Sequence, residues 1–121
     1  MKQGVLILAH GSREPETQKT LEAIMDMLHD RLPETLLSHA YLQFCEKTLG
    51  AGLIELVQQG AEEITVVPYF LFSGIHIQED IPNEIRAFTE KHPSIRVRMG
   101  KTLGADPRLA DILADRVKDA L

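Results

Sequence analysis

Short apolar runs alternate along the chain with stretches in which apolar residues recur every three or four positions. Four of the runs favour strands, at residues 5–9, 36–42, 64–72 and 95–99. The first run is apolar without alternation, which is typical of a strand buried on both faces. Pro68 interrupts the third run and cannot donate a ladder hydrogen bond, so we expect that strand to end or bulge there.

Each run is followed by a stretch with the pattern of an amphipathic helix. Pro15 fits the first turn of the first helix, and Pro33 follows its end. Gly60 is placed to cap the C-terminus of the second helix, whereas Asp80 and Asp106 are placed to cap the N-termini of the third and fourth. The predicted inward faces consist of Leu21, Ile24, Met25 and Leu28; Leu49, Leu53, Leu56 and Val57; Ile81, Ile85 and Phe88; and Leu109, Ile112, Leu113 and Val117.

The element order strand–helix, repeated four times, predicts an α/β fold. We expect a single domain over residues 1–121, built as a three-layer sandwich with a four-stranded parallel sheet between helices. In such sheets ligands bind beyond the carboxyl ends of the strands, where the strand order reverses. If the strand order is 2-1-3-4, the first and third strands are neighbours at that reversal. Chemistry is therefore expected immediately after these two strands.

A histidine follows each of these two strands. His10 lies in the string AHGSR and His76 in the string FSGIH, and Gly11 and Gly74 free the backbone beside them. A lone histidine after a strand often only terminates it, but two on one rim favour a functional pair. Two imidazoles without thiolates suit an open site for Co²⁺, Fe²⁺, Ni²⁺ or Zn²⁺ rather than a closed structural zinc site. Neutral imidazole also accepts protons, so metal ligand and general base both stay open as roles.

Charge and cysteine content narrow the function classes. The 13 Lys and Arg residues against 18 Asp and Glu residues give a net charge of −5, which disfavours nucleic acid and anionic membrane surfaces as partners. Cys45 is the only cysteine, so no intrachain disulfide is possible. The apolar stretch near the N-terminus is too short for a signal peptide or a membrane span. We therefore expect a cytoplasmic protein that binds a small molecule.

The strings VLILAHGSR and ITVVPYFLFSGIHIQEDIP, at their separation in this chain, resemble the signatures of small sirohydrochlorin cobaltochelatases, the CbiX-type class II tetrapyrrole chelatases. The string YLQFCE resembles the end of that family's second strand, and the resemblance covers nearly the whole chain. It implies a chelatase-like fold in which His10 and His76 bind the metal and act in catalysis. It also implies ATP-independent insertion of Co²⁺, Fe²⁺ or Ni²⁺ into sirohydrochlorin, with the metal as substrate and no permanently bound cofactor. The chain has no GxxxxGK[ST] loop, in agreement with the absence of an ATP requirement.

The resemblance also bears on assembly. The family's long forms contain two such halves around one cleft, and the short forms resemble one half that pairs as a homodimer. We expect the same here, because a flat tetrapyrrole on a single open rim would keep one face in water. Exposed aromatic residues are expected to line the cleft or seal the dimer contact near the end of the third strand: Tyr69, Phe70 and Phe72.

Gln43 stands where the family usually has a glutamate. A glutamine can hydrogen-bond to the ring or to metal-bound water, but it cannot accept a proton. Glu46 is close in sequence but points to the opposite face of an extended segment, and Lys47 stands where the family commonly has a proline. Gln43 is therefore a candidate catalytic residue, with the general base left open. The alternative is a tetrapyrrole or metal carrier without turnover. A histidine phosphatase is disfavoured, since Ala9 occupies the position where that chemistry needs an arginine.

Further residues near the predicted rim are candidates for binding the substrate. Ser12, Arg13 and Gly74 are the predicted substrate-binding residues; Arg13 can pair with a carboxylate through two hydrogen bonds, and Ser12 can also cap the first helix. The remaining polar candidates are weaker candidates for a catalytic or binding role. Asp80 is expected to cap a helix, Cys45 to be a small buried residue, and Glu79 to face either the cleft or solvent. His29 and His92 are expected at the surface, and His39 is expected to be a packed or exposed strand residue.

Overall fold

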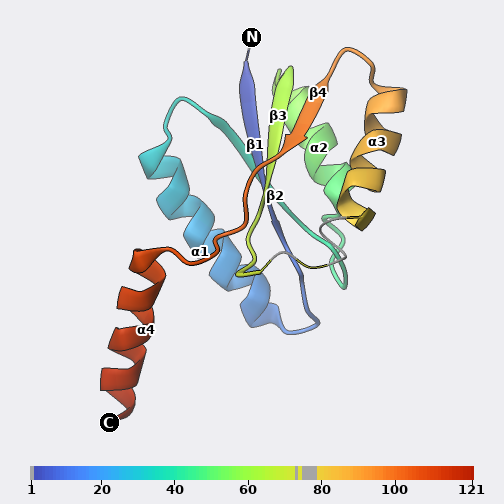
Figure 1. Cartoon of the computed structure of the whole chain (residues 1–121). Coiled ribbons are helices and arrows are strands. Elements are labelled where there is room, and N and C mark those ends of the chain that lie inside the picture. The colour runs from blue at the N-terminus through green and yellow to red at the C-terminus, as the bar shows by residue number, and fades with distance from the viewer. Residues whose placement is uncertain (1, 73, 75–78) are drawn as a thin grey trace.

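The computed structural model describes residues 2–72, 74 and 79–121, and Figure 1 shows an α/β fold. The strands are β1 (Gln3–Ala9), β2 (Leu36–Tyr41), β3 (Glu63–Pro68) and β4 (Arg96–Met99). They alternate with the helices α1 (Pro15–Arg31), α2 (Leu49–Gln58), α3 (Ile81–Lys91) and α4 (Pro107–Ala120). The sheet has the order β2-β1-β3-β4, and every neighbouring pair is parallel. The predicted fold class is therefore confirmed, and the strand order is the one under which β1 and β3 are neighbours at the reversal.

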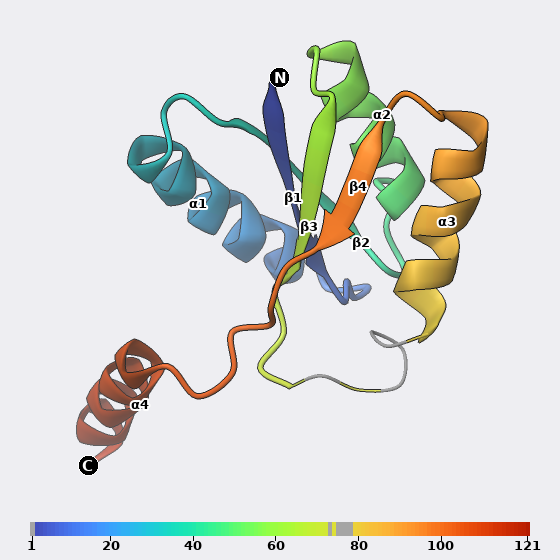
Figure 2. The ribbon, with the colours of Figure 1, turned by 45° about the horizontal axis from the view of Figure 1, so that its top comes forward.

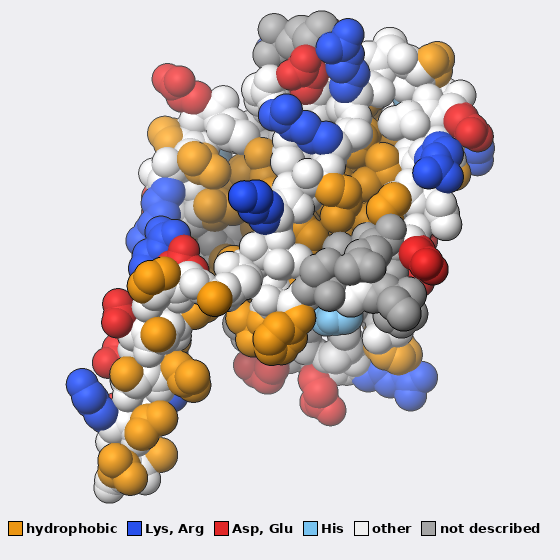
Figure 3. Space-filling model, in the orientation of Figure 1, with side chains coloured by type: hydrophobic (Ala, Val, Ile, Leu, Met, Phe, Trp, Pro, Cys, Tyr) orange, Lys and Arg blue, Asp and Glu red, His pale blue; other side chains and the backbone are white. Residues whose placement is uncertain are grey.

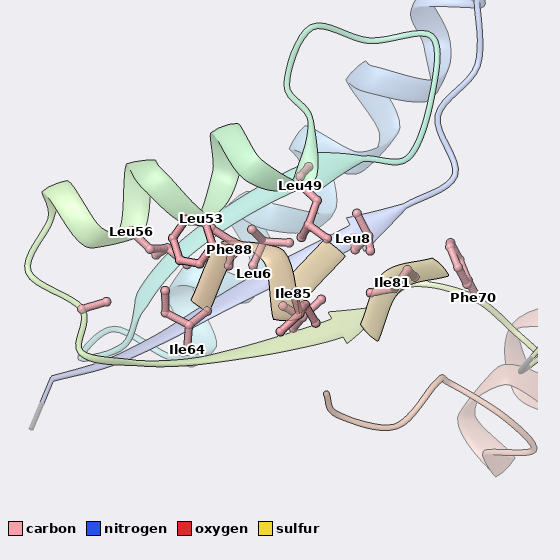
Figure 4. Packing of buried hydrophobic residues seen from close by; sticks show 13 residues of the cluster. Leu6, Leu8, Leu49, Leu53, Leu56, Ile64, Phe70, Ile81, Ile85 and Phe88 are labelled. Atoms are coloured by element: carbon pink, nitrogen blue, oxygen red, sulfur yellow. The ribbon is translucent and has the colours of Figure 1, made fainter. Parts of the chain in front are cut away.

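The central strand β1 is buried on both faces, as its continuous apolar run predicts. Leu6 and Leu8 are fully buried in the larger core, which α2 and α3 complete on one face of the sheet. Ile7 and Ala9 point the other way and meet Leu21 of α1. Figures 1 and 2 show α1 on one side of the sheet and α2 and α3 on the other, and Figure 4 shows the side chains of the larger core.

The third strand ends at Pro68, four residues before the end of its apolar run. Pro68 pairs with Leu8 in the register of β1 and β3, and the next amide, of Tyr69, still donates to the Leu8 carbonyl at 2.7 Å. The predicted extension of the strand to residue 72 was wrong, because the chain leaves the sheet after this bond. The proline therefore marks the end of the strand, which is one of the two outcomes expected of it.

The predicted helix caps are only partly correct. Gly60 follows α2 with a φ of 101°, a conformation that favours glycine, and the Asp106 carboxylate accepts from the Arg108 amide at 2.9 Å. The side-chain hydrogen bond of Asp106 with Arg108 holds the pKa of that carboxyl below its usual value. Asp80 was expected to cap α3, but its side chain makes no capping hydrogen bond. Its φ of −67° and ψ of −46° are already helical, so it lacks the extended backbone of a capping residue.

Helix α4 forms as predicted but does not cover the sheet. Within the described part of the chain none of its residues is buried. Ile112, Leu113 and Val117, on its apolar face, are 48%, 65% and 52% exposed. Figures 1 and 2 show α4 projecting from the body of the protein. The expectation that all helices flank the sheet therefore holds for α1, α2 and α3 only. Among the described helices, none has the length and apolarity needed to cross a membrane.

Candidate functional site

The candidate site lies where the parallel strands end. His10 directly follows β1, and its imidazole stacks on the ring of Phe70, with the ring centroids 4.0 Å apart and the planes at 17°. Phe70 is 6% exposed, so a fixed apolar surface supports one face of the imidazole. Phe70 was expected at the surface, and that prediction was wrong. Its neighbours Tyr69 and Phe72 are exposed, at 37% and 80%, as expected.

The segment after β2 lies against the turn that carries His10. The Leu42 amide donates to the Ala9 carbonyl at 2.9 Å, and the Gln43 amide donates to the His10 carbonyl at 3.1 Å. Gly11 has a φ of 83°, and a Cβ built on it would lie 2.2 Å from the Gln43 carbonyl oxygen. Only glycine allows this approach, so Gly11 brings the His10 turn and the Gln43 segment together.

An open cavity of about 330 Å³ adjoins His10. Two acidic residues of the segment that begins α3, Asp80 and Glu84, line it together with Gln43. No role was predicted for Glu84, and Asp80 was expected to be a helix cap rather than a ligand. The signal for Glu84 was its place in the first turn of a helix that starts at the carboxyl-end rim. Leu42 and Ile81 complete the lining of this cavity.

A second open cavity of about 440 Å³ lies on the α1 side of His10. It is lined by the turn after β1 and the first turns of α1, including Ser12, Thr17 and Tyr69. The Ser12 hydroxyl accepts from the Glu14 amide at 3.1 Å and is hydrogen-bonded to Thr17. Ser12 therefore shapes the turn before α1 and is not its N-cap, which is Glu14. His10 is shared by both cavities, and Ser12 borders one of them.

The other predicted site residues differ in how the structure places them. The Arg13 guanidinium lies 4.7 Å from the ring centroid of Phe44, a cation–π contact at the surface of the rim. Gly74 is exposed, and a Cβ on it would meet none of the described atoms within 4 Å. His76 lies outside the described residues, so its pairing with His10 stays a prediction.

The remaining histidines belong to other parts of the fold. His39 packs edge-on against Tyr41, and burial, followed by the charge of Lys47, lowers its pKa. His92 was expected at the surface, but it is half-buried and stacks on Phe88 at 4.3 Å. His29 is exposed on α1, as expected. Among the described residues, no group of three or more His, Cys, Asp and Glu side chains is placed to hold a metal ion.

Residues 4–120 match the family model of CbiX. The chain is 33% identical over 119 residues to the sirohydrochlorin ferrochelatase of Bacillus subtilis, a match covering 98% of this chain and 46% of that protein. It is 28% identical over 137 residues to the sirohydrochlorin cobaltochelatase of Methanopyrus kandleri, covering 97% of this chain and 96% of that protein.

Among solved structures, the chain resembles the cobalt complex of the sirohydrochlorin chelatase SirB from Bacillus subtilis subspecies spizizenii, with a TM-score of 0.91 and 34% identity. That match covers 98% of this chain and 51% of SirB, so the chain spans about half the length of SirB and of the ferrochelatase. The family match runs from β1, through the rim that carries His10, to the end of α4. The chain therefore belongs to the CbiX family.

Proposed function

We propose that this protein inserts a divalent metal ion into sirohydrochlorin without ATP. The observation that carries the proposal is the position of His10, stacked on Phe70 and open to two cavities at the carboxyl-end rim. Family membership supports it, because the similar proteins are named sirohydrochlorin chelatases. Those names include both ferrochelatases and cobaltochelatases, so the proposal extends to Co²⁺ and Fe²⁺, with Ni²⁺ as a further substrate to test.

In this proposal His10 and His76 hold the incoming metal through imidazole nitrogens. Two histidines leave most of the coordination sphere to water and to the ring nitrogens, so the metal can be passed on. Stacking on Phe70 restricts the plane of the His10 imidazole. The ring orientation is thereby set before the metal arrives, which lowers the cost of ordering the ligand during transfer.

Insertion also requires that two ring N–H protons leave as the metal enters, which keeps the charge of the complex balanced. Gln43 cannot accept a proton, although its amide can hydrogen-bond to the ring or to metal-bound water. The Glu84 carboxylate lines the same cavity as His10 and Gln43. We therefore propose that Glu84 accepts one ring proton, that a rim histidine accepts the other once its nitrogen has released the metal to the ring, and that Gln43 has a positioning role.

Sirohydrochlorin carries several carboxylates around a broad, flat ring. Arg13 is the cation proposed to receive one of them, and its contact with Phe44 holds the guanidinium at the edge of the rim. The Ser12 hydroxyl and the backbone at Gly74 are proposed as further polar contacts. Since a single rim covers only one face of the ring, the proposed functional unit is a two-fold symmetric homodimer with the rims facing each other.

The direct test is insertion of Co²⁺, Fe²⁺ and Ni²⁺ into sirohydrochlorin, followed by absorbance against a protein-free reaction. We expect rates above the spontaneous rate with at least one metal. His10→Ala should reduce the insertion rate to the spontaneous rate. His29→Ala, which changes an exposed histidine on α1, should leave the insertion rate at the wild-type value. Tight binding of the ring or the metal without faster insertion would overturn the proposal and indicate a carrier instead.

A further inference from the structure

Phe44 combines two features that are unfavourable for folding. Its φ is 63°, and it is the only described residue other than glycine with a positive φ, a conformation that crowds a residue with a Cβ. It is also 53% exposed and belongs to neither of the described hydrophobic cores. A glycine would fit this backbone better, and a polar side chain would suit this surface better. The fold alone therefore does not account for a phenylalanine here, and a role in binding is the alternative.

Hydrogen bonds on both sides of Phe44 hold its backbone in place. Before it, the Gln43 amide donates to the His10 carbonyl at 3.1 Å. After it, the Cys45 thiol donates to the Ser12 carbonyl, with the sulfur and the oxygen 3.9 Å apart. Both acceptors belong to the turn that follows β1, so Phe44 is fixed relative to the turn that carries His10.

The Phe44 ring supports the side chain of Arg13. The Arg13 guanidinium lies 4.7 Å from the centroid of the ring, and Arg13 is exposed. Within the described part of the chain, no hydrogen bond or ion pair engages this guanidinium. A guanidinium has five N–H donors, so Arg13 can bind a carboxylate while it rests on the aromatic ring. We name these two residues the Arg13–Phe44 pair.

The Arg13–Phe44 pair continues the surface of the candidate site. Phe44 directly follows Gln43, which lines the cavity beside His10, and Arg13 directly follows Ser12, which lines the second cavity. Each of the two segments that meet at the rim thus carries one residue at a cavity and one residue of the pair. Figure 3 shows apolar side chains on either side of the pale-blue histidine at the lower edge of the body, with Lys or Arg side chains close by.

An exposed aromatic ring beside an unpaired guanidinium suits a particular kind of ligand. A carboxylate can accept two parallel hydrogen bonds from the guanidinium, and a flat conjugated surface can pack against the aromatic ring. A ligand that satisfies both residues at once is a flat apolar plate with carboxylates around its edge. Sirohydrochlorin, the substrate of the proposed function, has this chemistry.

We propose that Phe44 is a substrate-binding residue, whose ring packs against the edge of sirohydrochlorin beside the carboxylate that Arg13 binds. This inference rests on the proposed function for the identity of the substrate, and it adds a contact in which the metal takes no part. It also gives the unfavourable backbone conformation a role. The aromatic ring is fixed before the substrate arrives, so little side-chain ordering opposes binding.

Equilibrium dialysis of metal-free sirohydrochlorin, followed by its absorbance, tests the contact directly. Phe44→Gly keeps the backbone conformation accessible and should raise the dissociation constant about tenfold. Phe44→Tyr retains the aromatic ring and should retain the wild-type affinity. The matched control is Met27→Ala on α1, because Met27 is 52% exposed, and it should leave the affinity unchanged. Wild-type affinity in Phe44→Gly would overturn the proposal.

The same titration in an Arg13→Gln background separates the two residues of the pair. Arg13→Gln alone should weaken binding, because the carboxylate loses its cation. Adding Phe44→Gly should weaken binding further, because the aromatic contact is lost as well. If the second substitution has no effect in this background, Phe44 acts only by supporting Arg13, and its proposed contact with the substrate is refuted.

Insertion kinetics with Co²⁺ distinguish this proposal from the proposed function. Phe44→Gly should raise the KM for sirohydrochlorin and leave kcat unchanged. A fall in kcat with an unchanged KM would overturn the proposal, because Phe44 would then act through the neighbouring Gln43. If the wild type binds sirohydrochlorin more tightly than Phe44→Gly but does not accelerate insertion, the proposed function fails and the binding role of Phe44 stands. If the wild type binds no sirohydrochlorin, both fail.

Discussion

Replacing Gly11 with alanine tests whether this glycine joins the His10 turn to the Gln43 segment. Gly11 has a φ of 83°, where an alanine pays a conformational cost of about 1 kcal/mol. Its Cβ would also lie 2.2 Å from the Gln43 carbonyl oxygen, whereas ordinary contact begins at 3.4 Å. The two segments must therefore separate by the difference of 1.2 Å.

Separating the two segments would lengthen two backbone hydrogen bonds, from the Leu42 amide to the Ala9 carbonyl at 2.9 Å and from the Gln43 amide to the His10 carbonyl at 3.1 Å. Weakening them costs about 1 kcal/mol each. With the conformational cost, Gly11→Ala should lower the free energy of unfolding by about 2–4 kcal/mol. This is a large part of the stability of an ordinary domain, about 5–15 kcal/mol, but the variant should still fold.

Urea unfolding measures the loss, and Gly104→Ala is the matched control. Gly104 also has a positive φ, of 60°, but a Cβ there meets none of the described atoms within 4 Å, so only the conformational cost of about 1 kcal/mol applies. The difference between the two variants isolates the close approach at the rim. If Gly11→Ala is no more destabilising than Gly104→Ala, the claim that Gly11 is required for this approach is refuted.

Four further results are expected. His10→Ala and His76→Ala should each abolish metal insertion without unfolding the protein, which urea unfolding checks. Near-wild-type rates in either variant would remove that residue from the mechanism. Gln43→Glu should raise the insertion rate or shift its pH optimum, because a second carboxylate can accept ring protons. An unchanged rate, pH profile and metal affinity would contradict this prediction. Glu84→Gln should slow metal insertion, and the same substitution should slow it less in a Gln43→Glu variant. If Glu84→Gln lowers the insertion rate by the same factor with Gln43 and with Glu at position 43, Glu84 is not a proton acceptor. Burial lowers the pKa of His39 below 6.5, so the unfolded state binds the proton more readily. The free energy of unfolding should therefore fall as the pH drops below 6.5 and level off below the folded-state pKa. Measured by urea unfolding, His39→Gln should show a smaller fall over this pH range. If the variant and the wild type show the same pH dependence, His39 is not the cause of the fall.

Much of the fold followed from local pattern. The continuous apolar run of β1 indicates burial on both faces, and the structure places Leu6 and Ile7 in opposite cores. Pro68 ends β3, because proline lacks the amide that a strand interior needs. Gly60 takes the positive φ that closes α2. The position of His10 after the first strand was also readable, since parallel strands place their carboxyl ends on one rim.

The sequence by itself therefore determined which elements form, that the strands are parallel, and the rim where chemistry is expected, because these depend on residue periodicity and on the conformational limits of proline and glycine. Only the tertiary structure decided that Phe70 is buried against His10, that Glu84 shares a cavity with Gln43, and that α4 leaves its own sheet uncovered. Periodicity shows which face of a helix or strand is apolar, but it does not predict which other element packs against that face. That choice depends on contacts between residues far apart in the chain.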